Sequence, residues 1–207
     1  MQKFLPWSGV LAAAAWAVQL FAATTPDDPA DPRAVTMIGD AVVANYAAGF
    51  ALLAGVLFLV LFAAATRHAL RSREAAESTY SSVAHGGLLV AAGGFGALGV
   101  VQIALTNAAR AHDAAATATL GQLALIGWLP ALAGLIAAFL AVGLGGLRTA
   151  ALPRWFALAT VALAVVGVLG PLAIIVYLVL PLWLATASVL LAVRRSTAPD
   201  RAAEAVV

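Results

Sequence analysis

The sequence contains no cysteine, and charged residues make up only 10% of its 207 residues. The absence of cysteine excludes disulfides, thiolate metal sites, iron–sulfur clusters and thiol catalysis. A soluble domain carries about 25% charged residues, so a chain this poor in charge could not cover a soluble surface. Hydrophobic residues account for 64%, a composition typical of an integral membrane protein.

Ionisable residues are also missing from the middle of every long apolar segment. Proton relays, voltage sensors and ion pumps need such residues within the membrane, and their absence argues against a proton-coupled transporter or an intramembrane acid–base enzyme. The chain has no GxSxG, HExxH or Walker sequence. Its net charge of +2 is too small to indicate nucleic-acid binding. The sequence therefore predicts a non-enzymatic protein without a cofactor and without a nucleic-acid partner.

Six apolar segments predict an all-α fold, a polytopic integral membrane bundle of six transmembrane helices. Backbone amides cannot stay unpaired in lipid, so each segment is expected to be helical. The last forty apolar residues would form a rod of about 60 Å, twice the ~30 Å hydrocarbon core. Gly170–Pro171 is the best place to divide them. The predicted helices span about 6–23, 45–66, 83–105, 120–147, 154–169 and 172–193.

The first segment could also be taken for a signal peptide, because Lys3 precedes its apolar run. A cut after Ala22 or Ala23 would leave Leu20 or Phe21 at the minus-three position, where a small residue is needed. We therefore expect a retained helix.

The positions of lysine and arginine predict the topology. With six crossings and a cytoplasmic N-terminus, nine of these 11 residues lie inside, and only Arg33 and Arg110 lie outside. This is a strong positive-inside bias. We expect a single domain over residues 1–195 in the cell (plasma) membrane, both termini in the cytoplasm, and a short disordered tail over 196–207.

The segment "TTPDDPADPR" is predicted to be an extracytoplasmic loop, because its prolines forbid a regular helix and its aspartates keep it hydrated. A short interfacial helix from about Val35 to Ala44 is expected to follow. A solvated loop is the simpler interpretation. Cation binding by Asp27, Asp28 and Asp31 is the alternative, although the glycine and spacing of a calcium loop are missing.

Small residues at four-residue spacing predict close helix packing, because transmembrane helices associate through small side chains. The glycine-rich helix over 83–105 is expected to be central. The same stripes offer surfaces for partner helices or self-association. Pro130 and Pro181 are each expected to kink a helix. The stripes are Ala47, Ala51 and Gly55; Gly87, Ala91 and Gly99; Gly93 and Ala97; and Gly134 with Ala138.

Carboxamides gather toward one side of the predicted topology. Apart from Gln2, every Asn and Gln falls near the outer end of one of the first four helices. An unpaired amide in hydrocarbon costs several kcal/mol, so these side chains could surround an outward-opening pocket. Alternatively, water and lipid headgroups satisfy them at the interface. The candidate residues are Gln19, Asp40, Asn45, Gln102, Asn107 and Gln122.

His68 and His85 fall at the same predicted membrane face, and two such histidines could ligate haem. However, His68 lies among Arg67 and Arg71 in a hydrated segment, and the chain has no helical HxxxH pair for zinc. Structural roles are therefore favoured for both histidines.

Three stretches carry a family resemblance: "PDDPADPRAVTMIGDAVVANYAAG", "LPRW" and "PLWLATASVLLAVRR". On these the chain resembles a family of small six-helix membrane proteins of high-GC Gram-positive bacteria, known as a domain of unknown function. The resemblance covers most of the chain and implies a six-helix fold. It implies no activity and no functional residues.

Together these features predict a structural or accessory membrane component that packs against membrane lipid or partner helices. The alternative is a small-molecule permease or binding protein that uses the outer polar pocket. The two differ in what the carboxamides do: in a permease they line a water-filled cavity, and in an accessory protein they pair with one another or face headgroups.

Overall fold

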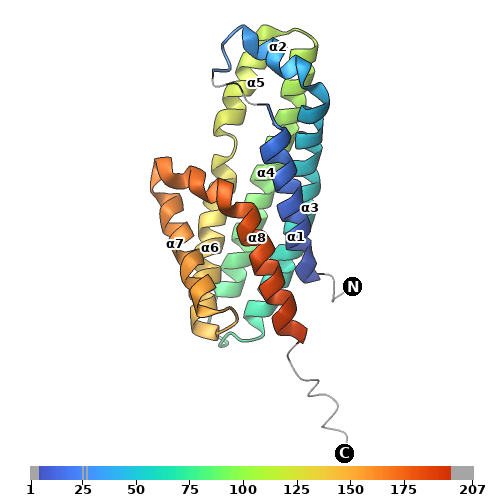
Figure 1. Cartoon of the computed structure of the whole chain (residues 1–207). Coiled ribbons are helices and arrows are strands. Elements are labelled where there is room, and N and C mark those ends of the chain that lie inside the picture. Colours follow the sequence, from blue (N-terminus) through green and yellow to red (C-terminus); the bar gives the residue numbers. More distant parts are fainter. Residues whose placement is uncertain (1–4, 25, 27, 197–207) are drawn as a thin grey trace, which may run out of the picture.

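The computed structural model describes residues 5–24, 26 and 28–196, and every regular element within them is a helix (Figure 1). The prediction of an all-helical chain is confirmed. In chain order the elements are η1 (Leu5–Trp7), α1 (Ser8–Ala22), α2 (Arg33–Asp40), α3 (Val42–Arg71), α4 (Tyr80–Arg110), α5 (Ala114–Ile126), α6 (Leu129–Thr149), α7 (Arg154–Val168), η2 (Gly170–Leu172) and α8 (Ala173–Ser196).

Four helical segments are long and apolar enough to cross a membrane: α3, α4, the α5–α6 pair over Ala114–Thr149, and Ala173–Arg194 of α8. Helices α1 and α7 are apolar but shorter, with 15 residues each. At 1.5 Å per residue, 15 residues reach about 22 Å, less than the ~30 Å hydrocarbon core. The described residues therefore support a membrane protein, with two of the six predicted segments falling short of a full span.

Helices α3 and α4 extend well beyond the apolar segments that predicted them. Helix α3 continues to Arg71 and α4 runs from Tyr80 to Arg110, whereas the sequence indicated about 45–66 and 83–105. Nothing in the polar flanks breaks a helix, since neither flank contains proline inside the helix. The apolar residues therefore predicted only the middle of α3 and of α4, and not the helix ends.

The segment expected as one helix over 120–147 is two helices, α5 and α6, joined at Gly127 and Trp128. Pro130 lies in the first turn of α6. A backbone N–H in the first turn has no partner within the helix, so a proline there costs no hydrogen bond. The expectation that Pro130 would kink the interior of a helix is therefore wrong, because the chain breaks before the proline. Pro181 does lie inside its helix, α8.

The helices form an upright bundle in which α1 begins and α8 ends at the same end (Figure 1). We call this the basal end, and we call the opposite end, where α2 lies, the distal end. Helices α3 and α4 run the full length, and α5 and α6 together do the same. In contrast, α7 turns into α8 about halfway along the bundle. The turn residues Val168, Leu169 and Leu172 are all exposed, as expected for side chains that face lipid.

Helix α4 packs against α3 on one side and against α6 on another. At the α4–α6 contact, an added Cβ on Gly87 would lie 2.7 Å from the backbone oxygen of Gly134. Gly99 faces the other way, toward the backbone oxygen of Gly49 in α3. Gly93 is exposed, and no neighbouring atom lies within 4 Å of its added Cβ. The glycine-rich helix therefore has two packed faces and one outward face.

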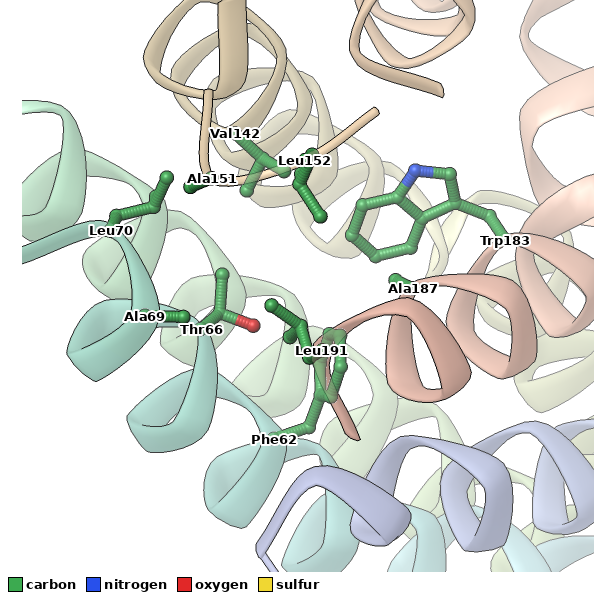
Figure 2. Close-up of a pocket in the computed structure, with 10 residues that line it drawn as sticks. All are labelled: Phe62, Thr66, Ala69, Leu70, Val142, Ala151, Leu152, Trp183, Ala187 and Leu191. Carbon is green, nitrogen blue, oxygen red and sulfur yellow. The ribbon is translucent and has the colours of Figure 1, made fainter. Parts of the chain in front are cut away.

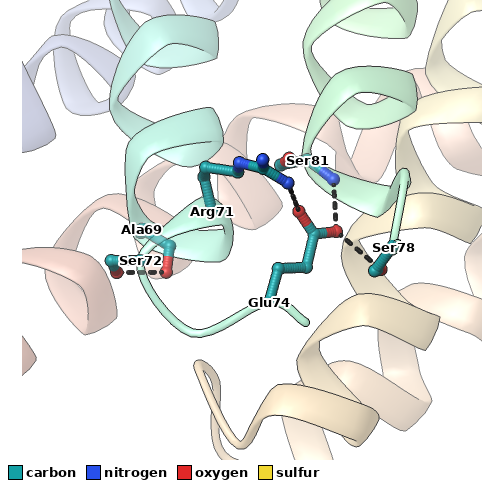
Figure 3. Close-up of polar contacts among 6 residues, drawn as sticks. All are labelled: Ala69, Arg71, Ser72, Glu74, Ser78 and Ser81. Atoms are coloured by element: carbon teal, nitrogen blue, oxygen red, sulfur yellow. Dashed lines mark hydrogen bonds and ion pairs between the residues drawn. The ribbon is translucent and has the colours of Figure 1, made fainter. Parts of the chain in front are cut away.

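Glu74 closes the basal loop between α3 and α4 (Figure 3). Its Oε1 accepts hydrogen bonds from the backbone N–H of Ser81, at 2.8 Å, and from the hydroxyl of Ser78, at 3.0 Å. Its Oε2 lies 3.9 Å from a guanidinium nitrogen of Arg71. Because Ser81 is in the first turn of α4, the carboxylate pairs one of the N–H groups that a helix start leaves without a partner.

Burial of Glu74 by itself raises the pKa of this carboxyl, but the hydrogen bonds from Ser81 and Ser78 and the charge of Arg71 outweigh it. The net effect lowers the pKa below its ordinary value of 4.5. A lowered pKa in the folded state means that the ionised carboxylate stabilises the fold above about pH 4.5, and that this stabilisation is lost as the pH falls further.

We expect the variant Glu74→Gln to melt at a lower temperature than the parent protein at pH 7, and the two to converge on acidification below pH 4.5. Thermal unfolding in mild detergent at a series of pH values measures this. The matched control is Glu77→Gln in the same loop, where the exposed side chain should show no such convergence. A constant difference between Glu74→Gln and parent at every pH would contradict the assignment.

Candidate functional site

The strongest candidate site is a cavity of about 230 Å³ in the distal half of the bundle, partly open on one side. We call it the distal recess. Its lining includes Ile174 and Tyr177, which belong to the start of α8, about halfway along the bundle (Figure 1). Residues from α1, α4, α5, the α5–α6 joint and α8 line it: Gln19, Leu98, Gln102, Ala124, Leu125, Trp128, Ile174 and Tyr177.

Asn45 is fully buried behind the recess and holds together the segments around it. Its Oδ1 accepts the backbone N–H of Thr24 at 2.8 Å, and its Nδ2 donates to the carbonyl of Ile38 at 3.3 Å. Gln102 of α4 donates from Nε2 to the same Oδ1 at 3.1 Å. One side chain thus connects the chain after α1, the helix α2 and the two long helices α3 and α4.

The contacts of Asn45 fix the orientation of Gln102. A backbone N–H can only donate and a backbone carbonyl can only accept, so the Asn45 amide has a single possible orientation. Gln102 must then present its NH₂ group to Asn45 Oδ1. Its Oε1 makes no hydrogen bond within the described residues, while the side chain lines the recess. Gln102 therefore offers the recess an acceptor.

Gln19 supplies the complementary group. It is 9% exposed, and its Oε1 accepts the hydroxyl of Tyr177 at 2.8 Å. Its Nε2 has no hydrogen-bond partner among the described residues, and the side chain lines the recess. The recess thus contains one amide donor and one amide acceptor that have no partner in the described part of the chain.

Aromatic rings form the basal wall of the recess. The ring centroids of Trp16 and Tyr177 lie 4.7 Å apart, and those of Trp128 and Tyr177 lie 6.3 Å apart, both edge-on. The indole N–H of Trp16 donates to the backbone oxygen of Tyr177 at 3.2 Å. Beneath them, the space beside Phe95 and Trp128 is too narrow for a water molecule. The recess therefore ends at a packed aromatic layer.

The rim of the recess is apolar. Leu125 is 38% exposed and Ile174 is 48% exposed, whereas no charged side chain contributes to the lining given above. An opening bordered by exposed leucine and isoleucine suits entry from lipid better than entry from water. The site can therefore hold an uncharged polar group attached to an apolar body.

The structure brings together three of the six residues predicted for an outer pocket: Gln19 and Gln102 in the lining and Asn45 behind them. Asn107 is exposed, and its Oδ1 accepts the hydroxyl of Tyr46 at 2.5 Å. Gln122 and Asp40 are also exposed and do not line the recess. Trp128 and Tyr177 were not predicted as site residues. Tyr177 could have been, because its hydroxyl needs a hydrogen-bond partner in an otherwise apolar segment.

The other polar residues singled out from the sequence do not gather into a site. Within the described residues, His, Asp and Glu form no group of three that could hold a metal ion. Asp28 and Asp31 accept hydrogen bonds from the backbone of their own loop, at Ala30 and Arg33. Asp27 lies outside the described residues. His68 is exposed at the end of α3, and His85 is half-buried in α4.

Comparisons with protein-family models, with curated proteins and with solved structures give no match for this chain. The resemblance to a six-helix family therefore stays a prediction.

Proposed function

We propose that this protein is a non-enzymatic membrane component that binds an uncharged amphiphile, with the polar head of the ligand in the distal recess and its apolar body in lipid. The observation that carries this proposal is the pairing of a donor, Gln19 Nε2, with an acceptor, Gln102 Oε1, inside an apolar cavity. Both atoms are open to the recess, and a ligand that pairs with both gains two hydrogen bonds in an apolar surrounding, where hydrogen bonds are electrostatically stronger than in water.

The chemistry of the recess indicates the ligand class. A head that carries both a carbonyl and a hydroxyl would accept from Gln19 and donate to Gln102. A full charge is disfavoured because no ionised side chain lines the recess to balance it. The volume of about 230 Å³ holds a small head and not a whole lipid. Neutral glycerolipids are the simplest class that fits.

The aromatic layer supports binding over permeation, which was the alternative from the sequence. A permease needs a path to the basal side, and the space below the recess is filled by Trp128, Tyr177 and Phe95. Two of the predicted carboxamides, Gln102 and Asn45, are hydrogen-bonded to each other, and a third, Gln19, is hydrogen-bonded to Tyr177. This pairing is typical of a structural or accessory protein.

For the topology we propose that both termini are cytoplasmic and that six apolar segments enter the cell membrane. Six arginines of the described residues lie toward the basal end: Arg67, Arg71, Arg73, Arg148, Arg154 and Arg194. Only Arg33 and Arg110 are distal, which supports a cytoplasmic basal face. Helix α7 is then too short for a full span on its own, and it turns directly into α8, which is long enough to cross the membrane.

Self-association through small residues is the remaining part of the proposal. Gly87, Ala91 and Gly134 are used inside the bundle. In contrast, Gly93 and Ala97 are exposed on α4, so a partner helix or second copy can approach along that outward face.

Native mass spectrometry from mild detergent, titrated with dioctanoylglycerol, tests the recess. We expect one bound copy, and about tenfold weaker binding by Gln19→Leu and by Gln102→Leu, which corresponds to about 1.4 kcal/mol for each lost hydrogen bond. Gln122→Leu is the matched control, because Gln122 is exposed and outside the recess. Equal weakening by all three variants, or binding of hexadecane as tightly as the glycerolipid, would contradict the proposal.

A further inference from the structure

The start of α8 is held against α1 by a hydrogen bond that a proline makes possible. In an α-helix the carbonyl of Tyr177 would accept the backbone N–H of residue 181, but residue 181 is proline and has no N–H to donate. The indole N–H of Trp16 in α1 donates to this carbonyl at 3.2 Å. Trp16 is buried, and a carbonyl left without a partner in such a place costs free energy. Pro181 and Trp16 therefore act together to hold Tyr177 beside α1.

The part of α8 that follows the proline is fixed to a different neighbour. The indole N–H of Trp183 donates to Oγ1 of Thr160 in α7 at 2.9 Å, and both residues are buried. Figure 2 shows Trp183 beside a space between α3, α8 and the α6–α7 connection. That space is narrow and, apart from Thr66, lined by apolar residues, so it has no room for a ligand. The turn of α8 that contains Pro181 thus lies between two fixed points, one on α1 and one on α7.

Tyr177, held in this way, fixes the orientation of the Gln19 amide. Trp16 and Gln19 are neighbours on the surface of α1, three residues apart, and the ring of Tyr177 packs edge-on against Trp16 at 4.7 Å. The Tyr177 hydroxyl donates to Gln19 Oε1 at 2.8 Å. If the amide were reversed, Nε2 would meet the phenol oxygen and the phenol proton would lose its acceptor. The observed orientation is therefore favoured, and it leaves Nε2 as the group that Gln19 offers to the recess.

The recess thus presents three different kinds of group from different elements. The donor of Gln19 belongs to α1, and the acceptor of Gln102 belongs to α4, where Asn45 fixes its orientation. The apolar rim at Leu125 and Ile174 belongs to the end of α5 and the start of α8. A chiral ligand that matches a donor, an acceptor and an apolar exit in fixed places differs from its mirror image, because the mirror image can match only two of the three at once.

We propose that Tyr177 and Trp16 are positioning residues through which the distal recess selects one mirror image of a neutral glycerolipid. This inference rests on the function proposed above. In the mirror image that binds, an ester carbonyl accepts from Gln19, the free hydroxyl donates to Gln102, and the remaining ester arm leaves past the rim. The opposite mirror image loses one of these contacts. Selection therefore depends on the orientation of the two amides and not only on their presence.

Native mass spectrometry with the two enantiomers of dioctanoylglycerol that carry acyl groups on neighbouring carbons tests this inference. We expect the parent protein to bind one enantiomer roughly fivefold to tenfold more tightly, the effect of one lost hydrogen bond. In Tyr177→Phe the Gln19 amide is free to reverse, so the two enantiomers should bind almost equally. The matched control is Tyr46→Phe, which removes a hydroxyl bonded to Asn107 outside the recess and should keep the preference of the parent.

The ratio of the two affinities separates positioning from a general structural role, since a loss of stability weakens the binding of both enantiomers alike. Equal binding of the enantiomers by the parent, or a preference that Tyr177→Phe keeps, would overturn the inference and leave the proposed function intact. Failure of the parent to bind either enantiomer would contradict the proposed function, and the inference with it.

A second measurement tests the link between Trp16 and Pro181 without any ligand. Trp16→Phe should lower the melting temperature, because it keeps an aromatic ring but leaves the Tyr177 carbonyl without its donor. When Pro181→Ala is also present, residue 181 supplies a helical N–H to that carbonyl, and Trp16→Phe should lower the melting temperature much less. Equal losses with and without Pro181→Ala would show that Trp16 acts through packing alone, and would remove it from the positioning role.

Discussion

The variant Gly134→Ala is expected to lower the free energy of unfolding by about 3 kcal/mol, at the upper end of what overpacking costs. A methyl group at this position would lie 2.5 Å from the backbone nitrogen of Ala91 and 2.5 Å from the backbone oxygen of Gly87. Backbone atoms cannot rotate aside as side chains can. The two helices must therefore separate, and the contact between α4 and α6 lies in the middle of the core.

Unfolding in mixed micelles with increasing denaturing detergent measures this difference. The control is Gly93→Ala on α4, where the added methyl meets nothing within 4 Å. It should be neutral or stabilise the helix by up to about 1 kcal/mol, because alanine favours helix more than glycine does. Equal effects of the two variants would show that the α4–α6 contact is not as close as described.

The second large effect is expected for Asn45→Leu, which should cost about 3 kcal/mol or more. Leucine fills a similar volume but leaves the N–H of Thr24 and the carbonyl of Ile38 without their partner, at about 1–3 kcal/mol each. It also removes the acceptor of Gln102. Because these groups belong to different elements, the loss should loosen the distal end first.

Hydrogen exchange read by mass spectrometry distinguishes that local loosening from general destabilisation. In Asn45→Leu, exchange should rise in α2 and in the chain before it, while α7 stays as protected as in the parent. Asn107→Leu is the control, since Asn107 is exposed and its side chain is bonded to that of Tyr46; we expect a change within about 0.5 kcal/mol. Uniform exchange throughout Asn45→Leu would argue against a connecting role for this residue.

The helical character of the chain followed from the sequence because lipid imposes internal hydrogen bonding on every buried backbone. The ends of the helices did not follow, since polar residues such as Arg71 and Tyr80 continue a helix without any hydrophobic signal. The break at Gly127–Trp128 was missed for a related reason. An apolar run gives no indication of a joint inside it, and the nearby Pro130 suggested a kink when it in fact begins the next helix.

The candidate site was predictable in part. Carboxamides in an apolar chain must find partners, and this requirement alone pointed to Gln19, Asn45 and Gln102. The position of each helix along the bundle cannot be read from composition, so the sequence could not separate these from Asn107 and Gln122, which are exposed. Tyr177 reaches Gln19 only because α8 begins halfway along the bundle. That placement depends on tertiary packing.

The turn of α7 into α8 about halfway along the bundle leaves the basal part of the bundle wider than the distal part (Figure 1). In the orientation proposed above, the basal part would displace more lipid than the distal part, and lipid would cover the exposed turn at Leu169 and Leu172. A protein that tapers in this way takes up more area in one monolayer than in the other. We expect a protein of that shape to favour membranes that curve toward its narrower side.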